Sequence, residues 1–420
     1  MELLAPAGTP EKLRFAYLYG ADAAYFGLGG LSLRDRAGNF DDGDPAELAA
    51  ALRATKGSKR LYCAVNRYFH NEELRAFEER LDQVAQLPID AFIVSDLGVV
   101  PLLRARMPNC ELHLSTQANC TNREAARMYR DMGFSRIVAA RELSLHELSE
   151  IKNAVPDLEI EAFVHGAMCL AYSGRCFLSK WMAGRSGNTG DCAHSCRWEY
   201  ALHTGDTYLQ ERERPDEYYP VIEDDGHTMV LSSRDLCLID HLAAFRDAGI
   251  DSLKIEGRMK SVYYTAVVTR AYRKAIDAVM DPTAPDPAPF REALYEVSRR
   301  EYSTGFYFGD EAVQHPTETS YREEYRFLGV LEEDSTSAAS SPGAAVYFTA
   351  KNVCRIEDQV EVLGPDTAKL GLNNPVFLDE DGNEVDVVKP NRRYSISGPY
   401  DLSAGMALRR RIYDKERLKT

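Results

Sequence analysis

Four cysteines gather in one short, glycine-rich stretch of the chain and are the residues best suited to chemistry. They are Cys169, Cys176, Cys192 and Cys196, spaced C-x6-C-x15-C-x3-C. Four thiolates on such a segment can converge on one point, as a tetrahedral S4 metal site or an iron–sulfur cluster requires. Zinc sites usually use tight C-x2–4-C pairs, and only Cys192 and Cys196 resemble one. The wide first two gaps therefore favour a cluster; the alternative is four small core residues scattered by chance.

The start and the composition of the chain bear on its compartment. The chain has nine cysteines, an odd number, and opens with MELLAPAG, which lacks a basic and long apolar signal segment. We therefore expect a reducing cytoplasm, where clustered cysteines bind metal rather than form disulfides. No apolar run approaches the roughly 20 residues of a membrane span. The net charge of −15 argues against broad nucleic-acid binding, so any RNA contact needs a local basic patch.

Short apolar runs alternate with amphipathic stretches over the first 260 residues. The runs that we expect to be strands are 2–5, 23–27, 61–66, 91–95, 112–117, 136–140, 158–164 and 252–256. Alternation of this length predicts parallel βαβ units. Eight such runs favour a closed (β/α)8 TIM-like barrel, with a doubly wound open sheet as the alternative.

A change in pattern predicts a second domain. We expect the barrel, including the cysteine-rich segment 161–200, to occupy residues 1–315. Residues 316–420 alternate in the manner of a small antiparallel β-barrel, with a hairpin turn at Gly382-Asn383. Basic residues gather late in this region: Arg392, Arg393, Arg409, Arg410, Arg411, Lys415 and Arg417. They are either a solvated face or a patch that contacts RNA.

Polar residues close several of the predicted strands, where a barrel has its active site. His165 follows the seventh run and could donate or accept a proton. Lys254, Glu256 and Arg258 share one face of the last strand, and Arg141 closes the sixth. Buried charges of this kind either form a closed ion-pair network or await an anionic ligand. We expect the ligand, a small carboxylate.

The chain resembles a known family at several motifs. The segment EAFVHGAMCLAYSGRCFLS, from Glu161 to Ser179, follows the signature of peptidase family U32, and ELLAPAGTPEKLRFAYLYGADAAYFG, LSTQANCTN and KIEGRMKSVYY are similar to it as well. The resemblance extends to about residue 310. It implies an oxygen-independent hydroxylation factor that holds a [4Fe-4S] cluster through Cys169, Cys176, Cys192 and Cys196.

Within the family, the chain is most similar to the branch that forms 5-hydroxyuridine at the wobble position of tRNA. The resemblance implies tRNA as the partner, and prephenate as the small anionic co-substrate and oxygen donor. Cys237 departs from that branch and could replace Cys192 or Cys196 as a ligand. The alternatives are hydroxylation of a ribosomal RNA cytidine or a ubiquinone precursor, a collagenase-like peptidase, and a metal-stabilised RNA-binding scaffold without catalysis.

Overall fold

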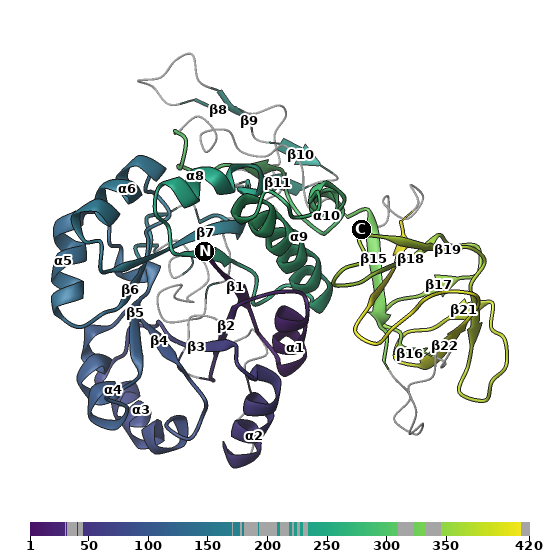
Figure 1. The fold of residues 1–420 in the computed structure, drawn as a ribbon, viewed down its shortest axis with the longest axis horizontal. Coiled ribbons are helices and arrows are strands. Elements are labelled where there is room, and N and C mark those ends of the chain that lie inside the picture. The colour runs from purple at the N-terminus through teal and green to yellow at the C-terminus, as the bar shows by residue number, and fades with distance from the viewer. Residues whose placement is uncertain are drawn as a thin grey trace. The chain divides into compact units, whose positions relative to one another are not determined.

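A computed structural model describes most of the chain (Figure 1). The residues it describes are 1–29, 31, 40, 45–169, 171–176, 179, 192, 208–210, 218–220, 222–224, 227–229, 234–309, 323–332 and 346–412. They form two compact units. The first unit comprises residues 1–17, 21–260 and 300–320, and the second comprises residues 18–20, 261–299 and 321–420. The expected domain boundary near residue 315 stays a prediction.

Eight parallel strands close into a barrel in the first unit, as the alternation of the sequence predicted. They are β1 (Glu2–Pro6), β2 (Ala23–Gly27), β3 (Arg60–Val65), β4 (Ala91–Val94), β5 (Glu111–Leu114), β6 (Arg136–Val138), β7 (Glu159–Ala167) and β13 (Ser252–Ile255). Each strand pairs with the next, and β13 closes the ring by pairing with both β7 and β1. β2 and β4 are buried along their whole length, as strands covered on both faces must be.

Helices connect the strands, and Figure 1 shows α3 to α6 outside strands β3 to β7. The helices of this unit are α1 (Pro10–Leu18), α2 (Pro45–Lys56), α3 (Asn71–Val84), α4 (Val100–Arg106), α5 (Arg123–Asp131), α6 (Leu145–Ala154) and α8 (Leu242–Asp247). Local sequence sets their starts. At α6, Ser144 Oγ accepts a hydrogen bond from the backbone of Glu147, and the Glu147 carboxylate accepts one from the backbone of Ser144.

The seventh strand is longer than its neighbours and carries an extension of the sheet. Beyond the point where β7 leaves β6, it pairs antiparallel with β12 (Asp235–Cys237), and β12 pairs with β14 (Tyr302–Ser303). Short strands β8 (Tyr208–Gln210), β9 (Tyr218–Pro220), β10 (Ile222–Asp224) and β11 (His227–Met229) form two hairpins in the segment between β7 and β12. The extension therefore lies at the carboxyl end of the barrel strands.

The second unit contains helix α9 and antiparallel sheets. Helix α9 (Val262–Met280) is capped by Ser261, whose hydroxyl accepts a hydrogen bond from the backbone of Tyr264. Helix α10 (Ala288–Glu292) follows. The strands are β15 (Tyr325–Val330), β16 (Val346–Thr349), β17 (Cys354–Arg355), β18 (Val360–Leu363), β19 (Leu370–Leu372), β20 (Val376–Leu378), β21 (Val387–Val388), β22 (Arg393–Ser397) and β23 (Ala407–Arg411). They form three antiparallel sheets, in agreement with the antiparallel pattern of the sequence.

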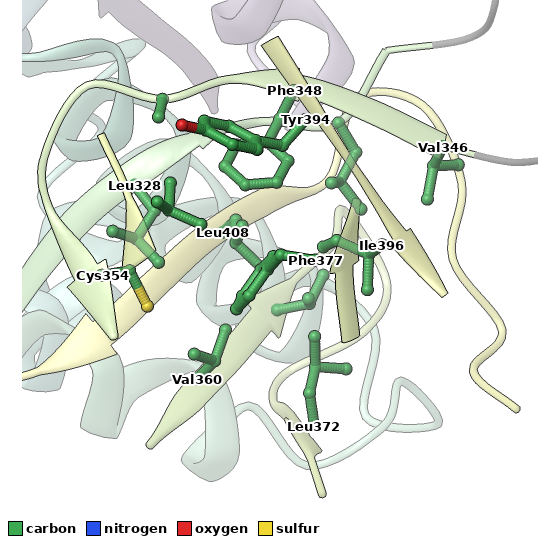
Figure 2. Close-up of a cluster of buried hydrophobic side chains, with 14 residues drawn as sticks. Leu328, Val346, Phe348, Cys354, Val360, Leu372, Phe377, Tyr394, Ile396 and Leu408 are labelled. Carbon is green, nitrogen blue, oxygen red and sulfur yellow. The ribbon is translucent and has the colours of Figure 1, made fainter. Parts of the chain in front are cut away.

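One apolar core joins these sheets (Figure 2). Phe348 and Phe377 meet edge to face, with ring centroids 6.0 Å apart, and Leu328, Val360 and Leu408 are fully or almost fully buried around them. The predicted hairpin turn is present, because Gly382 adopts a positive φ of 83° and Leu378 bridges Glu384 across the turn. Among the residues described, no helix is long and apolar enough to span a membrane.

Candidate active site at the mouth of the barrel

The candidate site begins where strand β7 ends, at the carboxyl end of the barrel strands. A close approach between two backbones fixes the course of the strand there. Gly166 has a φ of 107°, and a Cβ at this position would lie 2.6 Å from the backbone oxygen of Glu256. Only glycine fits such a conformation and spacing. The next residues of the chain are Ala167, Met168 and Cys169, so β7 leads the first cysteine out of the barrel at its mouth.

His165 lies in β7, immediately before that glycine, and its side chain is buried. Burial disfavours the imidazolium ion, and with a smaller effect of Lys260 it lowers the pKa of His165 to about 3. The Nε2 atom lies 3.5 Å from the hydroxyl oxygen of Tyr302, whose ring meets the imidazole edge to face. His165 is therefore neutral at physiological pH. In this form it can orient a polar group or accept a hydrogen bond, and it is a weak base.

A short loop after β7 carries Cys176 and is fastened to the mouth by Ser173. The Ser173 hydroxyl donates to Glu142 Oε2 over 3.0 Å, and the Ser173 backbone donates to Glu142 Oε1 over 3.2 Å. Asn119 also donates to the Glu142 carboxylate. Thr116 donates to Ser173 Oγ over 3.3 Å. Glu142 follows β6 and Thr116 follows β5, so the loop is tied to two neighbouring strand ends.

Gly174 brings the same loop into direct contact with the barrel. Its φ is 73°, and a Cβ there would lie 2.0 Å from the backbone oxygen of Gln117. That oxygen also accepts a hydrogen bond from the hydroxyl of Tyr68 over 2.9 Å. No side chain other than hydrogen can occupy the space at Gly174 without moving the loop.

The cysteines expected as ligands differ in exposure, and one of them is not described by the structure. Cys169 is exposed, Cys176 and Cys192 are partly buried, and Cys196 lies outside the described part of the chain. Cys237, the alternative ligand, lies in β12 opposite His165 of β7. β12 thus brings Cys237 to the strand from which the cysteine loop departs. Among the residues described, no three His, Cys, Asp or Glu side chains are grouped closely enough to hold a metal ion.

Four other cysteines lie elsewhere among the described residues. Burial raises the pKa of Cys63, Cys110 and Cys354 to about 12 and that of Cys120 to about 11. A metal ligand must be a thiolate, and these thiols stay protonated in the physiological range. Cys63, Cys120 and Cys354 are buried and Cys110 is partly buried, so these four are poorly suited to hold a thiolate-bound group.

Arg141 closes β6 at the mouth, where the sequence placed it. Its Nη1 atom donates to the backbone oxygen of Ala167 over 3.1 Å, and its guanidinium carbon lies 4.1 Å from the centre of the Phe163 ring. The Nε atom is buried and has no hydrogen-bond partner within the described residues. Arg141 thus binds the strand that leads to Cys169 and keeps one N–H for a further acceptor.

Lys254 takes the first of the two alternatives expected for it, a closed ion pair. Its Nζ atom lies 2.7 Å from Glu161 Oε1, and both side chains are buried. The ammonium group also lies 4.4 Å from the ring centre of Tyr25. Burial by itself would raise the pKa of Glu161, but Lys254 and Arg136 together hold it below its ordinary value. Lys254 is therefore already neutralised by a protein carboxylate.

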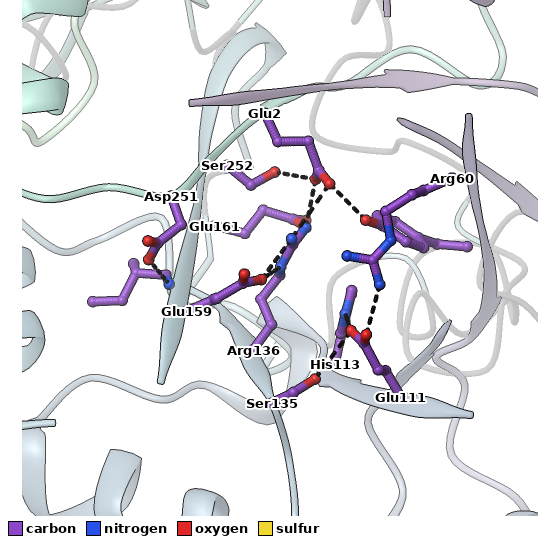
Figure 3. Close-up of polar contacts among 12 residues, drawn as sticks. Glu2, Arg60, Glu111, His113, Ser135, Arg136, Glu159, Glu161, Asp251 and Ser252 are labelled. Atoms are coloured by element: carbon purple, nitrogen blue, oxygen red, sulfur yellow. Dashed lines mark hydrogen bonds and ion pairs between the residues drawn. The ribbon is translucent and has the colours of Figure 1, made fainter. Parts of the chain in front are cut away.

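Arg136 is the centre of this network and was not among the site residues predicted from the sequence (Figure 3). Its Nη1 atom lies 3.0 Å from Glu161 Oε2 and 2.6 Å from Glu2 Oε1, and its Nη2 atom lies 2.6 Å from Glu159. Although burial would lower the pKa of Arg136, these carboxylates raise it above its ordinary value. A signal was present in the sequence, since Glu2, Arg136 and Glu161 are charges inside predicted barrel strands, which must pair when buried.

Glu256 and Arg258 follow β13, and Glu256 contacts Tyr25, the same residue whose ring lies beside the Lys254 ammonium group. The Glu256 carboxylate accepts a hydrogen bond from the hydroxyl of Tyr25 over 3.3 Å. The Arg258 side chain is buried, and its backbone oxygen accepts a hydrogen bond from Lys12 over 2.9 Å. We expected Lys254, Glu256 and Arg258 to form one anion pocket. Because Lys254 is paired with Glu161, such a pocket no longer includes Lys254.

Among the described residues of the second unit, two of the late basic residues lie inside the fold. Arg409 is fully buried and pairs with Glu361 and Glu296, each over 2.6 Å, while its guanidinium covers the ring of Tyr325. Arg410 is 4% exposed and donates to the backbone of Val353. These two arginines cannot contact RNA, because they neutralise carboxylates or hydrogen-bond inside the fold. Of the rest, Arg392 and Arg411 are exposed and Arg393 is partly buried, and Lys415 and Arg417 lie outside the described residues.

Residues 8–317 match the sequence profile described as Peptidase family U32. The tRNA hydroxylation protein P of Escherichia coli (strain K12) is 34% identical to this chain, and the match covers 99% of this chain and 97% of that protein.

Two further relatives carry different names. The 23S rRNA 5-hydroxycytidine C2501 synthase of Escherichia coli (strain K12) is 37% identical, over 67% of this chain and 40% of that protein. A protein of Porphyromonas gingivalis named collagenase is 32% identical, over 87% of each chain. The chain is thus similar to proteins named for RNA hydroxylation and to one named for proteolysis.

Proposed function

This chain belongs to peptidase family U32, and from that membership we propose that it modifies RNA by hydroxylation, with a wobble uridine of tRNA as its target. One observation carries the proposal: the similarity to tRNA hydroxylation protein P extends over 99% of this chain, including the antiparallel second unit. The similarity to the ribosomal RNA synthase covers a smaller share of both proteins. We therefore favour tRNA over ribosomal RNA, and with it the cytoplasm as the place of action.

Hydroxylation of uracil at C5 needs redox chemistry that side chains do not supply. Replacement of C5–H by C5–OH removes two electrons from the ring, so an electron acceptor and an oxygen source are both required. We propose that prephenate donates the oxygen atom and thereby accepts the two electrons, and that a [4Fe-4S] cluster would serve as the redox centre through which they pass. Cys169, Cys176, Cys192 and Cys196 would hold the cluster, with Cys237 as the alternative fourth ligand. The chemistry of these residues fits, because the described ones, Cys169, Cys176 and Cys192, are soft donors that are at least partly exposed.

The protein's own residues prepare the mouth for this chemistry. Ser173 and Gly174 hold the cysteine loop against two strand ends, and Arg141 holds the end of β7. We propose that Arg141 and Arg258 attract the carboxylates of the co-substrate, because guanidinium groups suit bidentate contact with carboxylates. His165 stays neutral and orients a polar group beside Tyr302.

A peptidase is the competing proposal, favoured by the relative named collagenase. The sequence contains neither an HExxH zinc motif nor a GxSxG nucleophile motif. A cysteine nucleophile at Cys169 would need a base, and His165 is the nearest histidine in sequence. Burial lowers the pKa of His165 to about 3, which makes it a poor base for a thiol. Hydroxylation is therefore the better supported function.

Measurement of tRNA modification tests the proposal. The gene is deleted in a host that lacks an oxygen-dependent enzyme for the same modification, and nucleosides of bulk tRNA are quantified by mass spectrometry. We expect 5-hydroxyuridine derivatives to disappear and to return with the intact gene. Unchanged levels would refute tRNA hydroxylation. Anaerobic purification tests the cluster separately, because a brown protein with broad visible absorption is expected and a colourless zinc protein contradicts it.

A further inference from the structure

The loop between Cys169 and Cys176 presents an aromatic and a basic side chain from one tight turn. The backbone N–H of Arg175 donates to the backbone oxygen of Tyr172 over 3.0 Å, and Gly174 supplies the positive φ of 73° inside the turn. Tyr172 is 67% exposed, and Arg175 is exposed as well. Among the described residues, no large apolar side chain is more exposed than Tyr172. Packing within the fold therefore does not account for the aromatic ring at this position.

This turn is rigidly attached, although its two end side chains are exposed. Ser173, between them, is buried and binds Glu142 through both its hydroxyl and its backbone N–H. Gly174 lies directly against the backbone of Gln117. A ligand that binds Tyr172 and Arg175 therefore does not have to order the loop first, which lowers the entropic cost of binding.

Further aromatic side chains lie near Arg175. Its charge is close enough to the phenol groups of Tyr68 and Tyr129 to lower their pKa, against the larger effect of burial, which raises it. Tyr68 follows β3 and Tyr129 lies in α5, and both are half-buried. The Arg175 cation thus lies near aromatic rings from three separate elements at the mouth, beside the cysteine loop.

A cation with aromatic rings is the arrangement by which proteins bind single-stranded nucleic acid. Bases stack on aromatic faces, and arginine contacts the phosphates between them. A base that is to be modified must leave its stack in the RNA, and it then needs a new stacking partner beside the reacting group. An exposed tyrosine on a fixed turn provides such a partner.

We propose that Tyr172 stacks on an unpaired nucleobase of the RNA substrate and that Arg175 contacts a phosphate next to that base. The proposal rests on the proposed function, since it assigns the RNA-binding residues of the same mouth. The stacking residue lies between Cys169 and Cys176 in the chain. The cysteine loop would therefore bind RNA in addition to carrying the proposed cluster ligands.

Equilibrium binding of a labelled RNA hairpin tests this assignment. The probe is the anticodon stem–loop of a tRNA with uridine at the wobble position, and binding to the intact protein is followed by fluorescence anisotropy at several salt concentrations. Replacement Tyr172→Ala should raise Kd roughly tenfold or more, as loss of one stacked base does. Tyr172→Phe should recover most of the lost affinity, because the ring remains.

Salt dependence separates the two residues. Arg175→Gln should reduce the slope of log K against log salt concentration by roughly 0.7, the value for one phosphate contact on a single strand. Tyr172→Ala should leave that slope unchanged, because stacking releases no counterions. A matched control is Tyr295→Ala, since Tyr295 is also exposed, at 45%, but lies in the second unit. Its Kd should equal that of the unaltered protein.

The outcomes distinguish this inference from the proposed function. If the unaltered protein binds the hairpin through Tyr172 but tRNA modification is independent of the gene, the function is wrong and the binding site stands. If the protein modifies tRNA while Tyr172→Ala binds the hairpin normally, the inference is overturned. Equal weakening by Tyr172→Ala and Tyr295→Ala also overturns it. Each variant is checked for an unchanged thermal unfolding midpoint and iron content.

Discussion

The Nζ atom of Lys254 lies 2.7 Å from Oε1 of Glu161, inside a barrel whose wall excludes water from both groups. Arg136 binds the second oxygen of the same carboxylate and also Glu2 (Figure 3). Two buried cations thus face the buried carboxylate of Glu161 and the partly buried carboxylate of Glu2, on strands β1, β6, β7 and β13. This balance makes the barrel interior a closed polar network, and it leaves the anion-binding role to residues nearer the mouth.

Removal of one charge from this network should destabilise the fold strongly. Glu161→Gln leaves Lys254 and Arg136 short of a negative charge in a buried site, and we expect the free energy of unfolding to fall by about 3–5 kcal/mol. Urea denaturation measures it. Asp157→Asn is the control, because Asp157 pairs with Arg130 at the surface, and its effect should stay within about 1 kcal/mol. A double-mutant cycle with Lys254→Met that shows no coupling would contradict the network.

Acid should destabilise the protein from a pH near neutrality, because of His165. Its pKa is lowered from 6.5 to about 3 in the folded state. Between these values the unfolded chain binds a proton that the folded chain does not, so the free energy of unfolding falls as the pH falls. The loss is at most about 1.4 kcal/mol per pH unit. His113 acts with the same sign, since burial lowers its pKa as well.

Stability measured from pH 7 to pH 4.5 checks this expectation. His165→Gln should reduce the pH dependence, because the buried titrating group is gone. His146→Gln should not, since His146 is 84% exposed. A pH profile identical in the His165→Gln variant and the unaltered protein would show that His165 titrates normally.

Substitution of single cysteines should distinguish the proposed cluster ligands from the other cysteines by the iron content of each variant. Serine at Cys169, Cys176, Cys192 or Cys196 should abolish or sharply reduce bound iron, because a thiolate ligand is lost. Cys110→Ser is the control, since burial keeps that thiol protonated, and its iron content should be unchanged. If Cys196→Ser retains iron and Cys237→Ser loses it, the fourth ligand is Cys237 in β12 and not Cys196.

Exchange of arginine for lysine tests the anion contact at the mouth. Arg258→Lys and Arg141→Lys keep the charge but lose the planar fork that binds a carboxylate at two points. We expect tRNA hydroxylation to fall at least roughly tenfold, the effect of about 1.4 kcal/mol, with iron content and the unfolding midpoint unchanged. Full activity in Arg258→Lys, or unfolding of Arg258→Ala, would assign that residue a structural role.

The attachment of the cysteine loop should be sensitive to one methyl group. Gly174→Ala places a Cβ against the backbone of Gln117 and forces a positive φ, so the turn must move. We expect loss of RNA binding and hydroxylation while the barrel stays folded, as judged by circular dichroism. Gly57→Ala is the matched control, because Gly57 also has a positive φ of 53° but has open space around it. Equal activity of the two variants would show that the loop position is unimportant.

The sequence by itself determined the barrel strands, the alternating helices and the place of the cysteine segment after the seventh strand. These follow from local patterns: apolar runs such as AFIV in β4 and a capping Ser144 before α6 specify their elements without reference to distant residues. The departure of Cys169 from the carboxyl end of β7 follows from the same order, as does the position of Arg141 after β6.

Only the tertiary structure decided which polar groups meet. The charges of Lys254, Glu256 and Arg258 on one strand are compatible with a ligand pocket or with internal ion pairs. For Lys254 the outcome depends on Glu161, which lies 93 residues earlier in the chain. Arg409 likewise belongs to a basic run in the sequence but is buried against Glu361. The bond between Ser173 and Glu142 joins a loop to another strand end. Partners so distant along the chain are selected by closure of the barrel and of the sheets, because only there does burial force each charge to find its counterpart.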